Sequence, residues 1–172
     1  MKNLALLGLI ICIASCGGMR KKSFEKNFET LAGPVASSFR GVNLGDGYQK
    51  VLTTEGPEYL EFQDSSMIRY TLHYTDSEEY KISYHFTNDR LHEIQFDAFL
   101  GQISDGEKLT KLFEQRFDKK YGPGAKDQGI LTWSNNGESV ELYDESEVFG
   151  YGKMRLLIFI TPAEPKPRPL PL

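Results

Sequence analysis

The chain has 172 residues, a formal net charge of −4 and two cysteines, and 40% of its residues are hydrophobic. This length and composition predict one globular domain with an ordinary core, and 12% aromatic residues argue against a mainly disordered chain. The acidic balance disfavours a general nucleic-acid binder, which needs a basic surface to neutralise phosphates. Two cysteines are too few for a small domain held together by several disulfides.

Residues 1–15 have the features of an export signal. Lys2 precedes an apolar run that is too short to cross a bilayer about 30 Å thick as a stable helix. The run ends in the letters IASC at residues 13–16, which resembles the lipobox of bacterial lipoproteins. In that family the bond before the cysteine is cut, and the cysteine receives a diacylglycerol and usually an N-acyl chain. The resemblance assigns lipidation to Cys16, and the alternatives are a plain secretory signal or a short uncleaved anchor.

Lipidation at Cys16 would have two consequences. Two or three acyl chains hold a membrane far more firmly than one, since each buried methylene contributes about 0.8 kcal/mol. Cys12 would leave with the signal, so the mature chain would have no free thiol, disulfide or thiolate metal site. Cysteine-protease, redox and zinc-ribbon chemistry is therefore not expected.

Residues 16–38 are expected to form a lipidated stem. Gly17 stands where an aspartate retains Gram-negative lipoproteins at the inner membrane, so the resemblance implies the outer membrane, facing the periplasm. The basic residues at 20–22 are either headgroup contacts or part of a solvated linker. Phe28 and Leu31 have helical spacing before Gly-Pro, which predicts either a short docking helix or a tether.

The folded domain is expected over residues 39–161, followed by a tail over residues 162–172. Five prolines favour an extended tail that cannot join a sheet, and it is expected to be a spacer or a recognition motif. The domain holds 13 Lys and Arg against 21 Asp and Glu, a net charge of −8, so the flanks supply +4. An acidic domain on a basic stem should be repelled by an anionic surface while the stem stays on it.

Two amphipathic helices are expected within the domain, each followed by strands. The first ends at Gly56 and the second at Gly122, each before a proline, and Ser104 and Glu107 have the spacing of a capping box at the second helix start. The pattern predicts an α+β fold with short helices on an antiparallel sheet, built from two tandem helix-plus-strands units. The apolar residues of the helices are Leu44, Tyr48, Val51 and Leu52, then Leu109, Leu112, Phe113, Phe117 and Tyr121.

Alternating residues predict the strands and their register. A three-residue turn at 88–90 sets Ile82 against Phe96, whereas a two-residue turn would set it against Gln95. Asn136-Gly137 predicts a second hairpin, and residues 154–160 predict a central or doubly covered strand. The other expected pairs are Tyr84 with Ile94, Lys81 with Asp97, His85 with Glu93, Leu131 with Leu142 and Trp133 with Val140. Four inward tyrosines, forming core or bordering a ligand cleft, are Tyr70, Tyr74, Tyr80 and Tyr84.

The helix-and-strand layout resembles two known groups, the BamE/SmpA-type lipoproteins and the β-lactamase inhibitor protein. In both, a short helix ending in Gly-Pro packs on an antiparallel sheet; BamE-type proteins usually have one such unit and the inhibitor has two. The resemblance implies the fold, and no binding residue is carried over. The matching residues are Leu44, Gly45, Val51, Gly56 and Pro57, then Phe117, Tyr121, Gly122 and Pro123.

No catalytic residue, metal site or cofactor is predicted, and no ligand-binding residue is assigned. His73 and His85 are expected on the outer face without being opposite each other, and His92 is expected to point inward near Phe86, so the histidines should not converge. The acidic residues within 141–147 lack the pattern of a calcium loop. Neither a dinucleotide loop nor a Gly-x-Ser-x-Gly elbow is present.

An anchor joined to a domain without recognisable catalytic residues predicts a noncatalytic periplasmic lipoprotein. Its partners would be the membrane, through the lipid on Cys16, and a protein that it binds or scaffolds at the bacterial envelope. The alternative is an inhibitor of a secreted or periplasmic hydrolase, which would need an exposed loop with aromatic and acidic side chains, such as residues 144–151. A third hypothesis, an envelope hydrolase, would need two carboxylates facing each other in a cleft.

Overall fold

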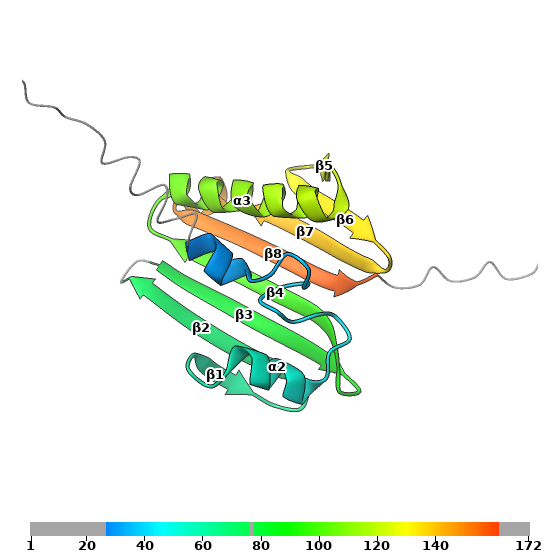
Figure 1. Ribbon diagram of the computed structural model, residues 1–172. Coiled ribbons are helices and arrows are strands. Elements are labelled where there is room, and N and C mark those ends of the chain that lie inside the picture. The colour runs from blue at the N-terminus through cyan, green and yellow to red at the C-terminus, as the bar shows by residue number, and fades with distance from the viewer. Residues whose placement is uncertain (1–26, 76–77, 162–172) are drawn as a thin grey trace, which may run out of the picture.

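One antiparallel sheet of eight strands makes up the fold, with the two longer helices and an N-terminal helical segment packed on one face (Figure 1). The structure is a computed structural model that describes residues 27–75 and 78–161. The helices are α2 (Tyr48–Glu55), α3 (Ile103–Tyr121) and α4 (Ser146–Phe149), preceded by a helical segment over residues 27–32. The α+β prediction is therefore confirmed. The strands are β1 (Leu60–Gln63), β2 (Met67–Thr75), β3 (Glu78–Thr87), β4 (Arg90–Leu100), β5 (Ala125–Asp127), β6 (Ile130–Asn135), β7 (Glu138–Asp144) and β8 (Gly152–Ile160).

The strand order is β1-β2-β3-β4-β8-β7-β6-β5, so the two halves of the chain meet where β4 pairs with β8. That pairing extends from Glu93 opposite Phe159 to Leu100 opposite Gly152. The halves therefore form one continuous sheet, and their interpretation as two tandem units stays a prediction. Residues 154–160 were expected to form a central or doubly covered strand. The position of β8 in the middle of the sheet confirms the central strand, and α3 covers one of its faces.

The β3–β4 hairpin has the predicted register but not the predicted turn. Ile82 pairs with Phe96 and Lys81 with Asp97, as expected. The expected three-residue turn is wrong, because Asn88 and Asp89 alone connect Thr87 with Arg90, both at positive φ, as in a type I′ turn. A β-bulge just beyond the turn restores the register. The other confirmed pairs are Tyr84 with Ile94, His85 with Glu93, Leu131 with Leu142 and Trp133 with Val140.

Because of the same bulge, His92 does not lie where the sequence predicts. Leu91, which is fully buried, takes the place opposite Phe86. His92 is the extra residue of the bulge and is partly exposed, with Nδ1 3.4 Å from the Thr87 hydroxyl. The expectation that His92 points inward is therefore wrong, because an extra residue shifts the alternation of the strand by one position.

Both helices end where the sequence predicts, but Leu44, expected on the first helix, lies before α2, and α3 begins differently. Gly56 and Gly122 follow the last helical residues, and each donates its N–H to the helix. The capping box at Ser104 is wrong, since Gln102 occupies the N-cap and no side chain caps the helix. The start is determined by packing, because a side chain at Gly106 would collide with Ser146 and with the backbone of Gly152.

The folded structure extends further toward the N-terminus than residue 39. The helical segment over residues 27–32 lies between α2 and α3 in Figure 1, over the sheet. Phe28 and Leu31 are buried, and the Phe28 ring meets Phe113 edge-on at 4.9 Å. These described residues of the expected stem therefore form a docking helix and not a free tether. The export signal, Cys16 and the tail over residues 162–172 lie outside the described residues.

Arg116 of α3 holds this N-terminal segment in place. Its buried guanidinium donates hydrogen bonds of 2.8 to 3.1 Å to the carbonyl oxygens of Ala32, Gly33 and Pro34. These carbonyls lie at the end of the helical segment, where backbone acceptors lack partners within a helix. Gly33 has φ +69°, and a Cβ there would lie 2.6 Å from the Arg40 Cα. The close approach of the two backbones requires glycine.

Replacing Phe113 with alanine should destabilise the domain strongly. The ring is fully buried against aromatic residues of the N-terminal segment, the sheet and α3, so its removal leaves a cavity shared by three elements. We expect the free energy of unfolding in urea to fall by about 3 to 5 kcal/mol. The matched control is Lys111→Ala on the exposed side of the same helix, which should change it by less than about 0.5 kcal/mol. Similar losses in both variants would contradict this packing.

Candidate binding surface

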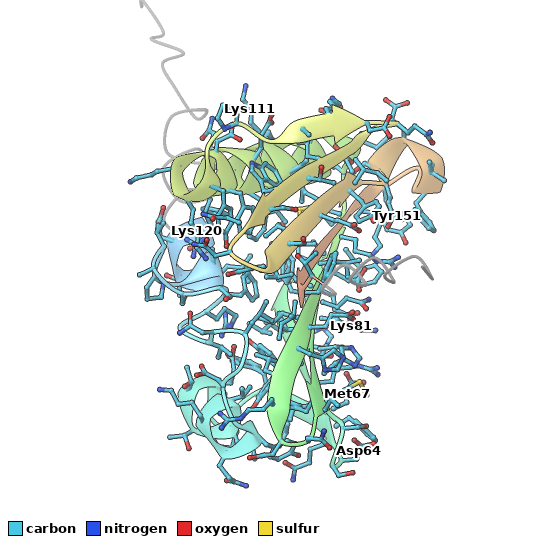
Figure 2. The ribbon with its side chains drawn as sticks, turned by 90° about the vertical axis from the view of Figure 1, so that its right-hand side faces the viewer. Asp64, Met67, Lys81, Lys111, Lys120 and Tyr151 are labelled. Atoms are coloured by element: carbon cyan, nitrogen blue, oxygen red, sulfur yellow. The ribbon has the colours of Figure 1, made fainter. Side chains whose placement is uncertain are left out.

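The face of the sheet opposite α2 and α3, called the uncovered face below, carries no described element except α4 at one end (Figure 2). Lys81 and Met67 project from it in Figure 2, on the other side of the sheet from Lys120 and α3. Strand alternation sends every second side chain to this side, and the pairings align those side chains in rows. One row runs Thr71, Lys81, Asp97, Arg155, Tyr143 and Ile130, and the next runs Arg69, Ser83, Gln95, Leu157, Glu141 and Thr132.

A charged network occupies the centre of this face. The Asp97 carboxylate of β4 accepts hydrogen bonds from Lys153 and from Arg155 Nε at 3.0 Å, both on β8, and from Gln95 Nε2 at 2.6 Å. The side chains of Lys153 and Asp97 are only 4% and 11% exposed. The Lys153 ammonium also lies 4.1 Å from the centre of the Phe99 ring. Burial alone would raise the pKa of Asp97, but the hydrogen bonds from its cationic and amide partners outweigh it and lower the pKa.

Two other carboxylates on the uncovered face also have a neighbouring basic side chain within the sheet. Lys81 lies 3.1 Å from Glu79, and His85 lies 3.9 Å from Glu93. Burial lowers the pKa of His85, and Glu93 counteracts this in part. The described residues hold no group of three or more His, Cys, Asp or Glu side chains placed to bind a metal ion. Because its charges have partners of their own, the centre of the face is suited to broad contact and not to capturing a small ion.

A second polar cluster lies on the helix side and is enclosed. Glu55 at the end of α2 accepts bonds of 2.8 and 3.0 Å from Arg40 Nε, and the Tyr84 hydroxyl also donates to it. Burial, reinforced by the negative charge of Glu55, raises the pKa of Tyr84 well above its usual value. This cluster ties α2 to β3 and to the preceding loop. Tyr70 is buried beside this cluster, with its ring 6.1 Å from Tyr84, and Tyr80 is buried against Phe96, which confirms the predicted tyrosine core; the Tyr74 side chain lies outside the described set.

The β7–β8 hairpin carries the most exposed apolar side chains of the described structure. Val148 and Phe149 of α4 are 85% and 51% exposed, and the rings of Phe149 and Tyr151 are 5.8 Å apart. Tyr151 lies on the same side of the sheet as Lys81 in Figure 2. We call Val148, Phe149 and Tyr151, with the acidic Asp144 and Glu147, the hairpin patch. The sequence indicated an exposed loop over residues 144–151, and the structure exposes those aromatic and acidic residues together.

A second exposed aromatic group lies at the edge strand β1. Phe62, 41% exposed, pairs with Arg69, so it faces the uncovered side of the sheet. Glu61 is the extra residue of a bulge between Leu60 and Phe62. Its carboxylate accepts a hydrogen bond of 2.6 Å from the Thr71 hydroxyl. This group was not among the residues expected to be functional. Its signal is the cluster of aromatic and acidic residues that follows Pro57.

No protein-family model, curated protein or solved structure matches this chain. Within residues 27–75 and 78–161, no helix combines the length and apolar character needed to cross a membrane.

The Asp97 network should make a measurable contribution to stability. In Asp97→Asn, Lys153 stays buried without its counter-charge, so we expect the free energy of unfolding at pH 7 to fall by about 3 kcal/mol. Because folding lowers the pKa of Asp97, the contribution is complete above the unfolded value of about 3.9 and is lost as pH falls through the folded value. Urea unfolding of wild type and variant at pH 7, 5 and 3 measures this.

The control for that series is Glu79→Gln, which breaks a partly exposed ion pair with Lys81. Such a pair contributes less than about 1 kcal/mol, so this variant should stay close to wild type at each pH. A difference between Asp97→Asn and wild type that is as large at pH 3 as at pH 7 would contradict the assigned role of the carboxylate.

Proposed function

We propose that this protein is a noncatalytic lipoprotein, anchored to the bacterial envelope by acyl chains on Cys16, that binds a protein partner through the uncovered face of its sheet. The observation that carries the proposal is the one-sided arrangement of the fold. Helices cover one face, while the other presents paired charges bordered by exposed aromatic residues on the β7–β8 hairpin and on β1.

A protein is the partner that suits this surface. Its rows extend over several strands, and neighbouring strands are about 4.8 Å apart, so the face is wide and suits a broad contact. Aromatic residues at the border of such a face are typical anchors of protein interfaces, where a few buried aromatic side chains supply most of the binding free energy. Binding to a broad polar face requires no catalytic group.

The anchor would keep the domain near the membrane. Phe28, the first buried residue described, follows Cys16 by 12 positions (28 − 16). Twelve residues span at most about 43 Å even when fully extended, which limits how far the domain can lie from the anchor. The chain enters the domain at the helix layer, where Phe28 packs on α3, so the opposite face is free to meet a partner. Gly17 favours the outer membrane, facing the periplasm, as the location.

Inhibition of a secreted or periplasmic hydrolase is a second candidate function. It is favoured by one observation: the hairpin patch projects aromatic and acidic side chains from a fixed loop. A segment of that kind can enter the cleft of an enzyme with little loss of conformational freedom. Reduced hydrolase activity with the purified domain, restored by Phe149→Ala, would support inhibition over scaffolding.

Lipidation is tested by labelling cells with palmitate. We expect the label on wild-type protein and on Cys12→Ala, since Cys12 lies within the signal, and no label on Cys16→Ala. Cys16→Ala should also leave the membrane fraction, because a protein without acyl chains has no comparable hold on a bilayer. Equal labelling of the two variants would contradict the assignment of Cys16.

The binding face is tested by placing a photo-crosslinking amino acid in the full chain in its own cells. We expect adducts with one protein from Met67 on β2 and from Tyr143 on β7, which share the uncovered face. A crosslinker at Lys111 on the exposed side of α3 is the control and should give none of this adduct. Adducts from Lys111 alone would place the partner on the helix layer and refute the proposed face.

A further inference from the structure

The hairpin patch is held rigidly although it is exposed. Asp144 Oδ1 accepts a 3.0 Å hydrogen bond from the Ser146 N–H, and the Glu145 N–H donates to the Lys153 carbonyl at 2.8 Å. The Ser146 hydroxyl is buried and bonded to both the N–H and the carbonyl of Lys153. Gly150, at φ +75°, ends α4. The backbone beneath Val148 and Phe149 is therefore already ordered, which reduces the entropy lost on binding.

Close packing against α3 reinforces this support. Ser146 lies against Gly106, where no side chain would fit, and Gly152 lies against the backbone of Gln102 and of Gly106. Both glycines leave room for the base of the hairpin to sit directly on the start of α3. The exposed apolar side chains therefore project from a fixed base.

The surroundings of the patch are acidic. From Asp127 to Gly152 the sequence contains six Asp and Glu residues and no Lys or Arg. Glu138 lies 3.7 Å from Lys120, and Glu145 interacts electrostatically with Arg155, whereas no ion pair among the described residues includes Asp144 or Glu147. The patch thus combines apolar side chains with two carboxylates, Asp144 and Glu147, that no described ion pair neutralises, and its complement is an apolar pocket with a basic rim.

We propose that the hairpin patch is the anchor of the binding surface, and that its occupant is a folded protein with an apolar pocket bordered by Lys or Arg. This inference rests on the proposed function and adds the place of strongest contact and the chemistry of the partner. Phe149 and Val148 enter the pocket, and Glu147 and Asp144 face its rim. An anionic bilayer is a poor occupant, because the same carboxylates are repelled by it.

The experiment begins with a photo-crosslinking residue in place of Phe149 in the full chain in its own cells. The captured protein is identified and purified, and its dissociation constant for the wild-type domain is measured at 50 and 300 mM NaCl. We expect affinity to fall several-fold at the higher salt, since screening weakens attraction between acidic and basic surfaces. Phe149→Ala should weaken binding at least 10-fold, and Glu147→Lys should weaken it and reduce the salt dependence.

The matched control is Ile160→Ala, which removes an apolar side chain of similar exposure, 47%, from the helix side of the sheet, two positions after the buried Ile158 of β8. It should change the dissociation constant less than 2-fold. Urea unfolding of each variant checks that the fold is intact, as expected for substitutions at exposed positions. Vesicles of phosphatidylethanolamine and phosphatidylglycerol are the parallel probe, and we expect no binding by the domain without its lipid.

Several results would overturn the inference. These are an equal loss in Ile160→Ala, an affinity that rises with salt, or vesicle binding that depends on Phe149. Adducts from Met67 and Tyr143 without any from Phe149 would also overturn it while leaving the proposed function standing. If none of the three positions gives an adduct, the proposed function itself fails.

Discussion

The pairing of β4 with β8 is the constraint on which the rest of the structure depends. Without this pairing, β4 and β8 would each be an edge strand with unpaired backbone groups. The sheet would then be divided into two four-stranded halves at the place where the core is centred. The same hydrogen bonds place Phe96 beside Leu156 under the helices and Asp97 beside Arg155 on the other face. One strand pairing thus determines both the centre of the core and the centre of the candidate binding surface.

The two faces of the sheet carry different kinds of side chain. Toward the helices, apolar and aromatic side chains are buried around Phe113, which touches the N-terminal segment and the sheet. Toward the other side, the same strands carry charges that are satisfied in place, such as Lys153 with Asp97. A face whose charges are already paired can be covered by a protein without leaving isolated buried ions. The exposed apolar residues are then confined to its borders, at the β7–β8 hairpin and at β1.

The N-terminal segment connects the proposed anchor with this arrangement. Arg116 and Phe28 bind the segment to α3, so the chain enters the domain as part of its helix layer. Under the proposed function, the membrane attachment and the partner surface are on opposite sides of the sheet. The expected domain boundary at residue 39 missed this, because two apolar residues at helical spacing do not reveal what they will pack against.

The sequence alone determined the local features: the α+β class, the ends of α2 and α3 at Gly56 and Gly122, and the pairing of Ile82 with Phe96. These follow from alternation, glycine conformations and the burial of neighbouring side chains, all of which act over short distances along the chain. Only the tertiary structure decided that β4 pairs with β8, that Lys153 joins Asp97 across 56 positions, and that the hairpin patch projects beside an uncovered face. Contacts between distant segments leave no periodic signal in one sequence, because they depend on how complete faces pack together.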